Sequence, residues 1–491
     1  MAEKKFLAFD IGAESGRAII GTLSDARLTL EEKHRFANPS GKINGHFHWS
    51  LLGQWEELKT GLRKAARSLG SGKLSGIGVD TWGVDFGLLD RNGDILGNPF
   101  MYRDPRTDGV MDKVFQRVPR QKVFAATGIQ FLPFNSLFQL YAMKLANSPL
   151  LMMADKLLFV PDLFHYLFTG VKKNEFSIAT TSQFYDPAKK AWASDLLKQL
   201  ELPTSILCDI VPAGTILGEL KKDVADECGV AGIPVITPAS HDTGSAVAAV
   251  PAEGDAWCYI SSGTWSLMGV ELPTPIINDK SLKYNYTNEG GVNGTIRFLK
   301  NIMGMWPVQE CRRQWLKEGR EYSYGELTRL ATDAKPFLTL LNPDHPPFLT
   351  PGEMPRKIEE FCRKTNQAAP SSAGDFVRAC LEGLALTYRK TLEGLEDVLG
   401  KKIRVIHIVG GGCQNDLLNQ MTADACARPV LAGPVEATAI GNLLVQAMAT
   451  GDVKSLAEVR SIIAASFDLK RYEPRDTATW DKAYLRYQEI L

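Results

Sequence analysis

The sequence lacks the features that mark several large classes of protein. Lysine plus arginine and aspartate plus glutamate number 56 each, so the formal net charge is zero. A polyanionic partner, such as nucleic acid or an anionic membrane surface, is therefore not expected. No apolar run is long enough to cross a bilayer, and the first apolar stretch is cut at Asp10, too early for the core of a signal peptide. We expect a cytoplasmic protein.

Cysteine usage excludes the common metal and redox motifs. The eight cysteines are scattered, and no C-x-x-C spacing occurs anywhere. This excludes the usual zinc-site spacing and a thioredoxin-like motif, and reduced thiols are the simplest interpretation. A bridge between Cys362 and Cys380 stays open, because spacing alone does not settle it.

Several catalytic motifs are also missing. The chain has no G-x-x-x-x-G-K-[ST], no G-x-S-x-G and no H-E-x-x-H. The run GGGCQN places Asn415 where a dinucleotide fingerprint has its third glycine. Asp85-Phe86-Gly87 spells a protein-kinase triplet, but H-R-D and V-A-I-K are absent, so we interpret it as chance in a buried strand. His46 and His48 have no further clustered ligands, which disfavours a metal site.

What the chain does contain is a repeated strand–turn–strand pattern. FLAF (6–9), the turn DIGAESGR (10–17) and AII (18–20) predict a β-hairpin that opens the chain. AWCYISSGTWSLMGVEL, which begins at residue 256, repeats this design around the turn SSGTWS (261–266). A length of 491 residues predicts two or three domains. We therefore expect a duplicated architecture with a boundary near residue 250.

Other segments alternate between helical and extended patterns, which indicates the α/β class. Apolar spacing predicts a helix over 51–69, with Ser50 as its N-cap. We expect two extended segments over 74–96 with a turn at Asn92-Gly93, and a strand, turn and helix over 232–250. Further expected helices are 151–168, 193–201, 376–399 and 417–427, and a buried strand is expected over 404–409.

The turns suggest contact with phosphate. Small residues let the backbone approach a ligand closely, so the two hairpins could hold a polyphosphate through their N–H groups. The glycines 410–412 after the strand at 404–409 offer a third close approach, suited to a nucleoside at a helix N-terminus. Taken singly, each has an ordinary structural interpretation, as an edge hairpin or a tight turn.

Eight segments together resemble one family. They are DIGAESGR, VDTWGVDF (79–86), YRDPRTDG (102–109), GIQFLPFNSL (128–137), ASHDTGSAV (239–247), SSGTWSLMG (261–269), LKNIMGMW (299–306) and VGGGCQN (409–415). In this order they cover nearly the whole chain and resemble the FGGY carbohydrate kinases of the actin-like ATPase superfamily. The resemblance implies two actin-like (ribonuclease H-like) α/β domains with an interdomain cleft. It also implies ATP with Mg²⁺, and phosphorylation of L-rhamnulose at its 1-hydroxyl in L-rhamnose breakdown.

The resemblance also assigns residues to roles. The domain 1–250 would hold the sugar site, the catalytic base and the first phosphate hairpin, and the domain 251–491 the second hairpin and the nucleotide site. ATP would be bound by Ala13, Glu14, Ser15, Gly16, Arg17, Thr264, Gln309 and Gly411. The sugar would be bound by Gly83, His241, Asp242, Thr243 and Asn301. Asp242 would be the catalytic base, and Asp10 would hold Mg²⁺ through water. Arg106 would either contact the sugar or make contacts only within its own loop.

The chemistry agrees with these roles on independent grounds. An aspartate is ionised at neutral pH and can accept the proton of an attacking hydroxyl. Mg²⁺ keeps most of its waters, so one or two carboxylates suffice to hold it. Glu14 is expected to contribute only its backbone, because a carboxylate aimed at triphosphate would be repelled. Without the family, a capped surface turn at His241-Asp242 is an equally good interpretation.

Two other functions stay open. A related kinase could act on another ketose or polyol, such as L-fuculose or xylulose. A non-catalytic actin-like module could instead bind ATP to polymerise or to drive a chaperone cycle, but it would have no use for Asp242. We expect a monomer, or at most a weak homo-oligomer.

Overall fold

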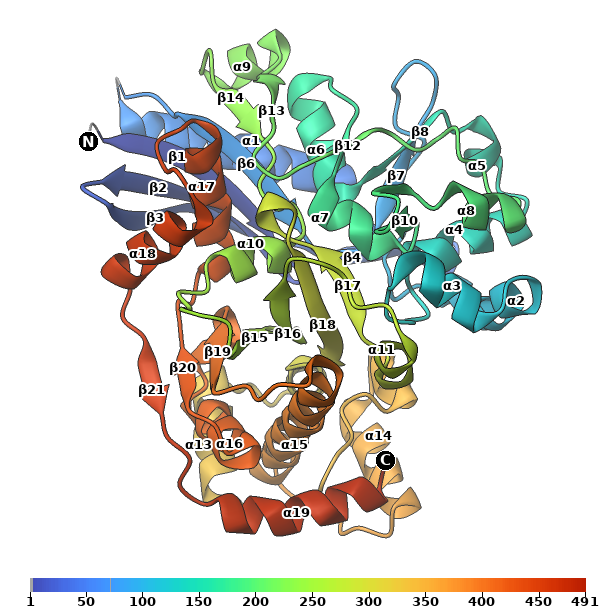
Figure 1. The fold of residues 1–491 in the computed structure, drawn as a ribbon, viewed down its shortest axis with the longest axis vertical. Coiled ribbons are helices and arrows are strands. Elements are labelled where there is room, and N and C mark those ends of the chain that lie inside the picture. The colour runs from blue at the N-terminus through green and yellow to red at the C-terminus, as the bar shows by residue number, and fades with distance from the viewer. Residues whose placement is uncertain (1–2, 71) are drawn as a thin grey trace. The chain divides into compact units, whose positions relative to one another are not determined.

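The structure is a computed structural model, and its residues 3–70 and 72–491 are described (Figure 1). The chain forms two compact units. Unit 1 comprises Met1–Pro251, Glu271–Phe298 and Ala437–Phe467, and unit 2 comprises Ala252–Val270, Leu299–Glu436 and Asp468–Leu491. No helix within the described ranges is long and apolar enough to cross a membrane.

Unit 1 is built on a six-stranded sheet in the order β13-β14-β6-β1-β2-β3. Its strands are β1 (Lys4–Ile11), β2 (Ser15–Ser24), β3 (Arg27–Ala37), β6 (Gly76–Thr81), β13 (Ile216–Glu219) and β14 (Pro234–Ile236). β1 and β2 form the expected antiparallel hairpin, and β6 runs parallel to both β1 and β14. The carboxyl ends of β1 and β6 therefore meet at one edge of the sheet.

Helices from distant parts of the sequence pack on this sheet. The expected helix over 51–69 is confirmed as α1 (Leu51–Leu69), which lies against β2 and β3, but Ser50 makes no side-chain capping bond. α17 (Ala437–Ala449) packs against β1 and β6, and α18 (Leu456–Ser466) packs against β3; Figure 1 shows both in red beside the blue strands. α17 also lies close to α10 (Asp242–Ala248), because a Cβ on Gly441 would be 1.9 Å from the Ser245 carbonyl oxygen.

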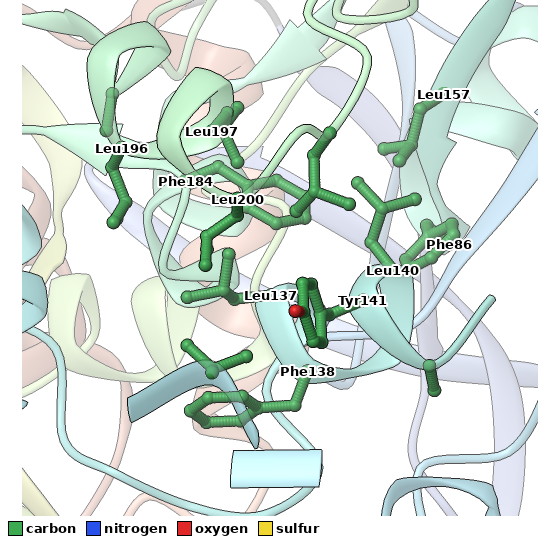
Figure 2. Close-up of a cluster of buried hydrophobic side chains, with 14 of the residues drawn as sticks. Phe86, Leu137, Phe138, Leu140, Tyr141, Leu157, Phe184, Leu196, Leu197 and Leu200 are labelled. Atoms are coloured by element: carbon green, nitrogen blue, oxygen red, sulfur yellow. The ribbon is translucent and has the colours of Figure 1, made fainter. Parts of the chain in front are cut away.

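A second apolar core in unit 1 gathers β7 (Phe86–Leu89), β8 (Lys156–Phe159), α4 (Ser136–Leu145) and α8 (Ser194–Gln199). Figure 2 shows Phe86, Leu140 and Leu157 converging within it. The expected helix over 151–168 is wrong in part, because residues 156–159 form a strand that pairs with β7. A strand here buries Leu157 and Phe159 in this core, which the helical pattern did not reveal.

The remaining elements of unit 1 are short. They are β4 (Ser40–Ile43), β5 (His46–Trp49), η1 (Pro105–Thr107), α2 (Val110–Arg117), α3 (Arg120–Thr127), α5 (Pro149–Met153), α6 (Val160–Thr169), β9 (Asn174–Glu175), α7 (Phe176–Ala179), η2 (Thr180–Ser182), β10 (Tyr185–Asp186), β11 (Ala191–Trp192), β12 (Ile210–Val211), α9 (Lys222–Cys228), α11 (Asp279–Tyr284), β17 (Thr287–Gly290) and η3 (Val292–Gly294).

Unit 2 contains β15 (Trp257–Ser262), β19 (Val405–Val409), β20 (Val430–Ala432) and β21 (Lys470–Tyr472). β16 (Trp265–Leu272) and β18 (Ile296–Met303) each carry residues of both units. Its helices are α12 (Trp306–Lys317), α13 (Tyr324–Asp333), η4 (Pro346–Leu349), α14 (Met354–Lys364), α15 (Ala373–Leu399), η5 (Gly411–Gln414), α16 (Asp416–Cys426) and α19 (Thr477–Glu489). The expected strand at 404–409 and helices at 376–399 and 417–427 are confirmed.

The second sheet repeats the strand order of the first. It runs β17-β18-β16-β15-β19-β20-β21, so β18-β16-β15-β19-β20-β21 corresponds to β3-β2-β1-β6-β14-β13. The senses also correspond, because β15 is antiparallel to β16 and parallel to β19, and β20 is antiparallel to β21. The duplicated architecture expected from the two hairpins is confirmed. The chemical roles of the segments 1–250 and 251–491 stay a prediction.

Other expectations concern histidine and cysteine. His46 Nδ1 lies 3.0 Å from Asp104 Oδ1, and His48 Nδ1 lies 3.2 Å from the Asn98 carbonyl oxygen. All eight cysteines are buried and free, so Cys362 and Cys380 are not bridged in this structure.

Candidate active site

Three carboxylates define the candidate site in unit 1. Asp10 and Asp80 are register partners near the carboxyl ends of β1 and β6, and Asp242 begins α10. Asp80 is fully buried, and its burial together with the nearby charges of Asp10 and Asp242 raises its pKa well above the ordinary value. Sequence reasoning missed Asp80. A signal was present, since FLAFD and GIGVD both place an aspartate after an apolar strand.

A network of buried side-chain amides holds the carboxylate of Asp80 in place. The Asn442 side-chain amide donates to Asp80 Oδ2 at 2.6 Å. The Gln446 amide in turn donates to Asn442 Oδ1 at 2.7 Å and to the Leu7 carbonyl at 3.0 Å. Asn442 and Gln446 are fully buried on α17. Helix α17, more than 350 residues further along the chain, therefore fixes a carboxylate on β6.

Asp242 keeps its carboxylate accessible while its backbone is fixed. Its side chain is 30% exposed, in contrast to buried Asp80. Asp242 Oδ1 accepts from the Thr243 backbone N–H at 2.5 Å and from Thr243 Oγ1 at 3.1 Å. His241 Nε2 lies 3.5 Å from the same oxygen. Asp242 therefore remains able to meet a ligand, whereas its neighbours are held in place.

Buried acceptors hold the loop that precedes α10. Glu175 Oε2 accepts from the Ser240 backbone N–H at 2.9 Å and from Ser177 Oγ at 2.5 Å. Ser177 Oγ then accepts from the His241 backbone N–H at 3.1 Å. Glu175 and Ser177 are fully buried. These bonds tie the backbone at 240–241 to the N-terminus of α7.

The His241 ring is held by two buried charged residues. Arg297 Nη2 lies 3.0 Å from His241 Nδ1, and Glu289 Oε2 lies 3.2 Å from the same nitrogen. Arg297 Nη2 and Glu289 Oε2 are 3.3 Å apart, and Arg297 Nε donates to the Gly290 carbonyl at 2.8 Å. Arg297 is fully buried. No motif in the sequence pointed to Glu289 or Arg297.

Gly83 lies in a strained turn beside His241. A Cβ at Gly83 would be 3.3 Å from His241 Nε2, so glycine leaves space next to this nitrogen. The following residue, Val84, has φ of 68°, an unusual conformation for a β-branched residue. Thr181 Oγ1 accepts from the Val84 N–H at 3.1 Å, and the Asp85 N–H donates to the Gly83 carbonyl at 2.9 Å. Surrounding structure thus holds this turn against strain.

Asp85 anchors the other end of that turn. Asp85 Oδ2 accepts from the indole N–H groups of Trp49 and Trp82 at 2.7 and 2.9 Å, and from the Tyr102 backbone N–H at 3.1 Å. Gln139 donates to Asp85 Oδ1 at 2.8 Å. Burial raises the pKa of Asp85 to about 6. The triplet at 85–87 is therefore no nucleotide motif, but its aspartate organises the loop that carries Gly83.

Arg106 has local partners that explain its position. Its Nη2 donates to Gln139 Oε1 at 2.7 Å, and its guanidinium lies 3.8 Å from the centre of the Phe100 ring. Burial lowers the pKa of Arg106 to about 10. These contacts account for Arg106 as a loop residue, and contact with the sugar stays a prediction.

The first hairpin places its residues in three different environments. Glu14 is exposed at the tip, and its backbone carbonyl accepts from the Asn38 N–H at 2.9 Å. Gly16 has a packing reason to be glycine, because its Cβ would lie 2.2 Å from the Phe36 ring. Arg17 Nε lies 3.7 Å from Asp10 Oδ2. Arg17 therefore contacts the carboxylate expected to serve the cation.

The second hairpin, in unit 2, contacts two other segments that the sequence analysis singled out, 299–306 and 409–415. The carbonyls of Gly263 and Thr264 accept from backbone N–H groups at the start of α12, and a Cβ on Gly304 would lie 2.7 Å from the Gly263 oxygen. On the other side, a Cβ on Gly412 would lie 2.1 Å from Ser262 Oγ. The tight packing explains these small residues within the unit.

The remaining predicted residues of unit 2 differ in their surroundings. Gln309 lies on α12, and its Oε1 is buried without a hydrogen-bond partner among the described residues. Gly411 faces open space, since nothing lies within 4 Å of where its Cβ would be. Asn301 is half-buried on β18. Asp10, Gly83, His241, Asp242 and Thr243 gather in unit 1, whereas Asn301, Thr264, Gln309 and Gly411 belong to unit 2.

Comparison with solved structures supports the fold. A xylulose kinase from Lactobacillus acidophilus matches with a TM-score of 0.81 at 15% identity, over 99% of this chain and 97% of that one. A glycerol kinase from Plasmodium falciparum, solved with ADP, matches with a TM-score of 0.75 at 15% identity, over 99% and 97% of the two chains. The expected α/β kinase fold with two domains is confirmed.

Comparison of sequences covers the whole chain. A rhamnulokinase from Bacteroides thetaiotaomicron is 44% identical over 489 residues, which span 100% of both chains. A rhamnulokinase from Halalkalibacterium halodurans is 43% identical over 470 residues, 96% of this chain and 99% of the relative. Models of the N-terminal and C-terminal domains of FGGY carbohydrate kinases match residues 5–249 and 258–450. The chain belongs to the FGGY family of carbohydrate kinases.

Proposed function

We propose that this protein is an ATP-dependent kinase that transfers the γ-phosphoryl group to the 1-hydroxyl of L-rhamnulose, giving L-rhamnulose 1-phosphate and ADP. The sugar follows from relatives named rhamnulokinase, which are 40–44% identical over 95–100% of the chain. The observation in the structure that carries the chemistry is the accessible Asp242 carboxylate beside His241, whose ring also lies next to Gly83.

Asp242 is the proposed catalytic base. Phosphoryl transfer needs an acceptor for the proton of the attacking hydroxyl and an in-line approach to the γ-phosphate. Asp242 is partly exposed, while Thr243 and the fixed loop at 240–241 hold its carboxylate in one orientation. It receives the hydroxyl proton as the sugar oxygen bonds to phosphorus and the β–γ bridging bond breaks. Asp80, fully buried, is less suited to meet substrate.

The sugar contacts are proposed for Gly83, His241, Thr243 and Asn301 together with Asp242. Gly83 supports this role because the missing Cβ leaves room beside His241 Nε2. The strained Val84 supports it too, since such backbone conformations cluster at ligand sites. Asn301 is proposed from the family resemblance.

The nucleotide contacts are proposed for the tip of the first hairpin, Ala13–Arg17, and for Thr264, Gln309 and Gly411. Gln309 supports the proposal because its buried Oε1 lacks a partner among the described residues, which a ligand donor would supply. Gly411 supports it because a ligand can approach its backbone from open space. Glu14 contributes backbone only, as its exposed side chain suggests.

A magnesium ion fits the donors near Asp10. The carboxylate oxygens of Asp10 are hard ligands, and the repulsion between Asp10 and Asp80, which adds to the raised pKa of buried Asp80, would be relieved by a cation. No group of three or more His, Cys, Asp or Glu residues in the described ranges is arranged to hold a metal ion. Asp10 would therefore hold Mg²⁺ largely through water, with the nucleotide's phosphates. When bound, the ion would offset the charge of the phosphates.

A coupled ADP-release assay tests the function. The purified protein is given Mg²⁺, ATP and, in separate reactions, L-rhamnulose, L-fuculose, L-xylulose, D-xylulose and glycerol. We expect the highest kcat/KM with L-rhamnulose, and NMR of the product should place phosphate on the 1-oxygen. A higher kcat/KM for another acceptor would assign the enzyme to that sugar. ATP turnover indifferent to every acceptor would instead favour a non-catalytic actin-like module.

A further inference from the structure

The ring of His241 faces a cation on one side and a carboxylate on the other. Arg297 Nη2 lies 3.0 Å from Nδ1, in the geometry of an N–H donor, and Asp242 Oδ1 lies 3.5 Å from Nε2. Arg297 is fully buried on β18, and its Nε is bound to the Gly290 carbonyl. The guanidinium therefore approaches the ring from a fixed direction.

Arginine has only donors, so the nitrogen that it faces must accept. A neutral imidazole carries its proton on one nitrogen and a lone pair on the other. If Nδ1 accepts from Arg297, the proton resides on Nε2. A proton on Nε2 is also favoured by the Asp242 carboxylate, whereas a lone pair there would face negative charge. The two sides of the ring independently favour the same tautomer.

Glu289 is the competing partner for Nδ1. Its Oε2 lies 3.2 Å from Nδ1 and would attract a proton to that nitrogen. However, Arg297 Nη2 is 3.3 Å from the same carboxylate oxygen and offsets its charge. A proton on Nδ1 would also point toward the donor Nη2, at 3.0 Å. Arg297 thus opposes the Nδ1–H form both by charge and by geometry.

We propose that Arg297 is a positioning residue that holds Nδ1 of His241 as a hydrogen-bond acceptor, so that the ring carries its proton on Nε2. His241 then presents an N–H donor toward the Asp242 carboxylate and the space left by Gly83. In the proposed kinase reaction, on which this role rests, His241 donates a hydrogen bond to a sugar oxygen and leaves proton acceptance to Asp242. The Nδ1–H tautomer would instead place the lone pair of Nε2 against the Asp242 carboxylate, and the N–H donor toward the sugar would be lost.

The direct test is ¹⁵N NMR of the full-length protein labelled at histidine, without substrate. The His241 signals are assigned by their loss in His241→Asn. We expect a protonated Nε2 and an unprotonated Nδ1. A protonated Nδ1, either as the other tautomer or as imidazolium, would overturn the proposal. This measurement needs no activity, so it is independent of whether L-rhamnulose is the substrate.

Arg297→Met then tests the cause. We expect the proton to move to Nδ1, facing Glu289, and kcat for the sugar to fall by up to roughly 10²-fold, as for other misplaced catalytic groups. The KM for ATP should not change. Arg460→Met is a matched control, since it removes another arginine of unit 1 that pairs with a glutamate, Glu271, at 2.6 Å.

The outcomes separate positioning from mere structural support. If folded Arg297→Met keeps the Nε2–H tautomer, the proposal is wrong, even if activity falls. If Arg297→Met does not fold, the spectrum of the wild-type protein decides, since a protonated Nδ1 there overturns the proposal. If the wild-type protein shows the expected tautomer but no sugar-dependent ADP release, the proposed kinase function is wrong and the assignment of the tautomer stands.

Discussion

The indole N–H of Trp49 donates a 2.7 Å hydrogen bond to Asp85 Oδ2 across 36 residues of sequence. Trp82 donates to the same oxygen at 2.9 Å, so two tryptophans hold one buried carboxylate. Trp82 is also the residue that precedes Gly83. Asp85 therefore connects β5 to the turn that lies beside His241, and its ionisation is linked to the stability of unit 1.

We expect Asp85 to make stability depend on pH. Burial raises its pKa from 3.8 to about 6 in the folded protein, so between these values the folded state binds more protons than the unfolded state. The contribution of Asp85 is full below pH 4 and is lost as the pH rises through 6, a change of roughly 3 kcal/mol. Urea unfolding of wild type and Asp85→Asn from pH 4 to 7.5 should show the wild type losing stability relative to the variant.

The exposed Asp112 provides the control for this experiment. Asp112→Asn should follow the wild-type profile at every pH. Because the Asp85→Asn side chain would also lose one acceptor, a constant offset between wild type and this variant is expected, and only the change of the difference with pH is diagnostic. Parallel profiles would show that Asp85 does not titrate in this range.

Alanine at Gly16 and alanine at Gly411 should affect different properties, the melting temperature in the first case and the KM for ATP in the second. A Cβ at Gly16 would lie 2.2 Å from the Phe36 ring, so Gly16→Ala should lower the melting temperature, and Phe36→Leu in the same chain should restore part of it. Gly411→Ala has space for its methyl group and should leave the melting temperature unchanged while raising the KM for ATP. An unchanged KM in Gly411→Ala would remove Gly411 from the nucleotide site.

Glu14 and Asp10 lie at the tip and the base of one hairpin, but we expect opposite outcomes. Glu14→Ser should leave sugar-dependent turnover close to wild type, because the exposed side chain has no proposed role. Asp10→Asn should remove most activity and weaken the dependence on Mg²⁺. Equal losses in Glu14→Ser and Asp10→Asn would contradict the assignment.

Elements set by local pattern were predictable, and those set by distant partners were not. The two hairpins and α15 have spacing and turn residues that act within a few positions along the chain. β8, in contrast, is apolar enough for a helix or a strand, and its pairing with the distant strand β7 decides between them. The order of strands in the sheets likewise depends on contacts that no local pattern encodes.

The same division applies to the site. Asp10, His241 and Asp242 stand in recognisable motifs, so their roles could be predicted. Arg297 contacts His241 across 56 residues, and Asn442 contacts Asp80 across 362, so folding alone brings these pairs together. Gly16 shows a further limit: a phosphate-binding turn and a packing contact both select glycine, and the sequence does not distinguish them.

Asp242→Asn should separate chemistry from binding. Asparagine keeps the size of aspartate and much of its hydrogen bonding but cannot accept the proton of the attacking hydroxyl. General bases typically contribute on the order of 10²–10⁴-fold, so single-turnover phosphoryl transfer should slow by roughly that factor. ATP affinity, measured by calorimetry, should not change, because the residues proposed to bind ATP are untouched. Sugar affinity should weaken modestly through loss of a charge-assisted hydrogen bond.

The rate of phosphoryl transfer, measured at unchanged stability, distinguishes a base from a turn residue at this position. Asp242 Oδ1 accepts from the Thr243 N–H and hydroxyl, and the oxygen of asparagine can keep both bonds, so the melting temperature should be close to wild type. If Asp242 only capped the turn, Asp242→Asn would keep near-normal phosphoryl transfer together with this unchanged stability. That result would also remove the reason for His241 to present an N–H to this carboxylate, because proton acceptance would then lie elsewhere.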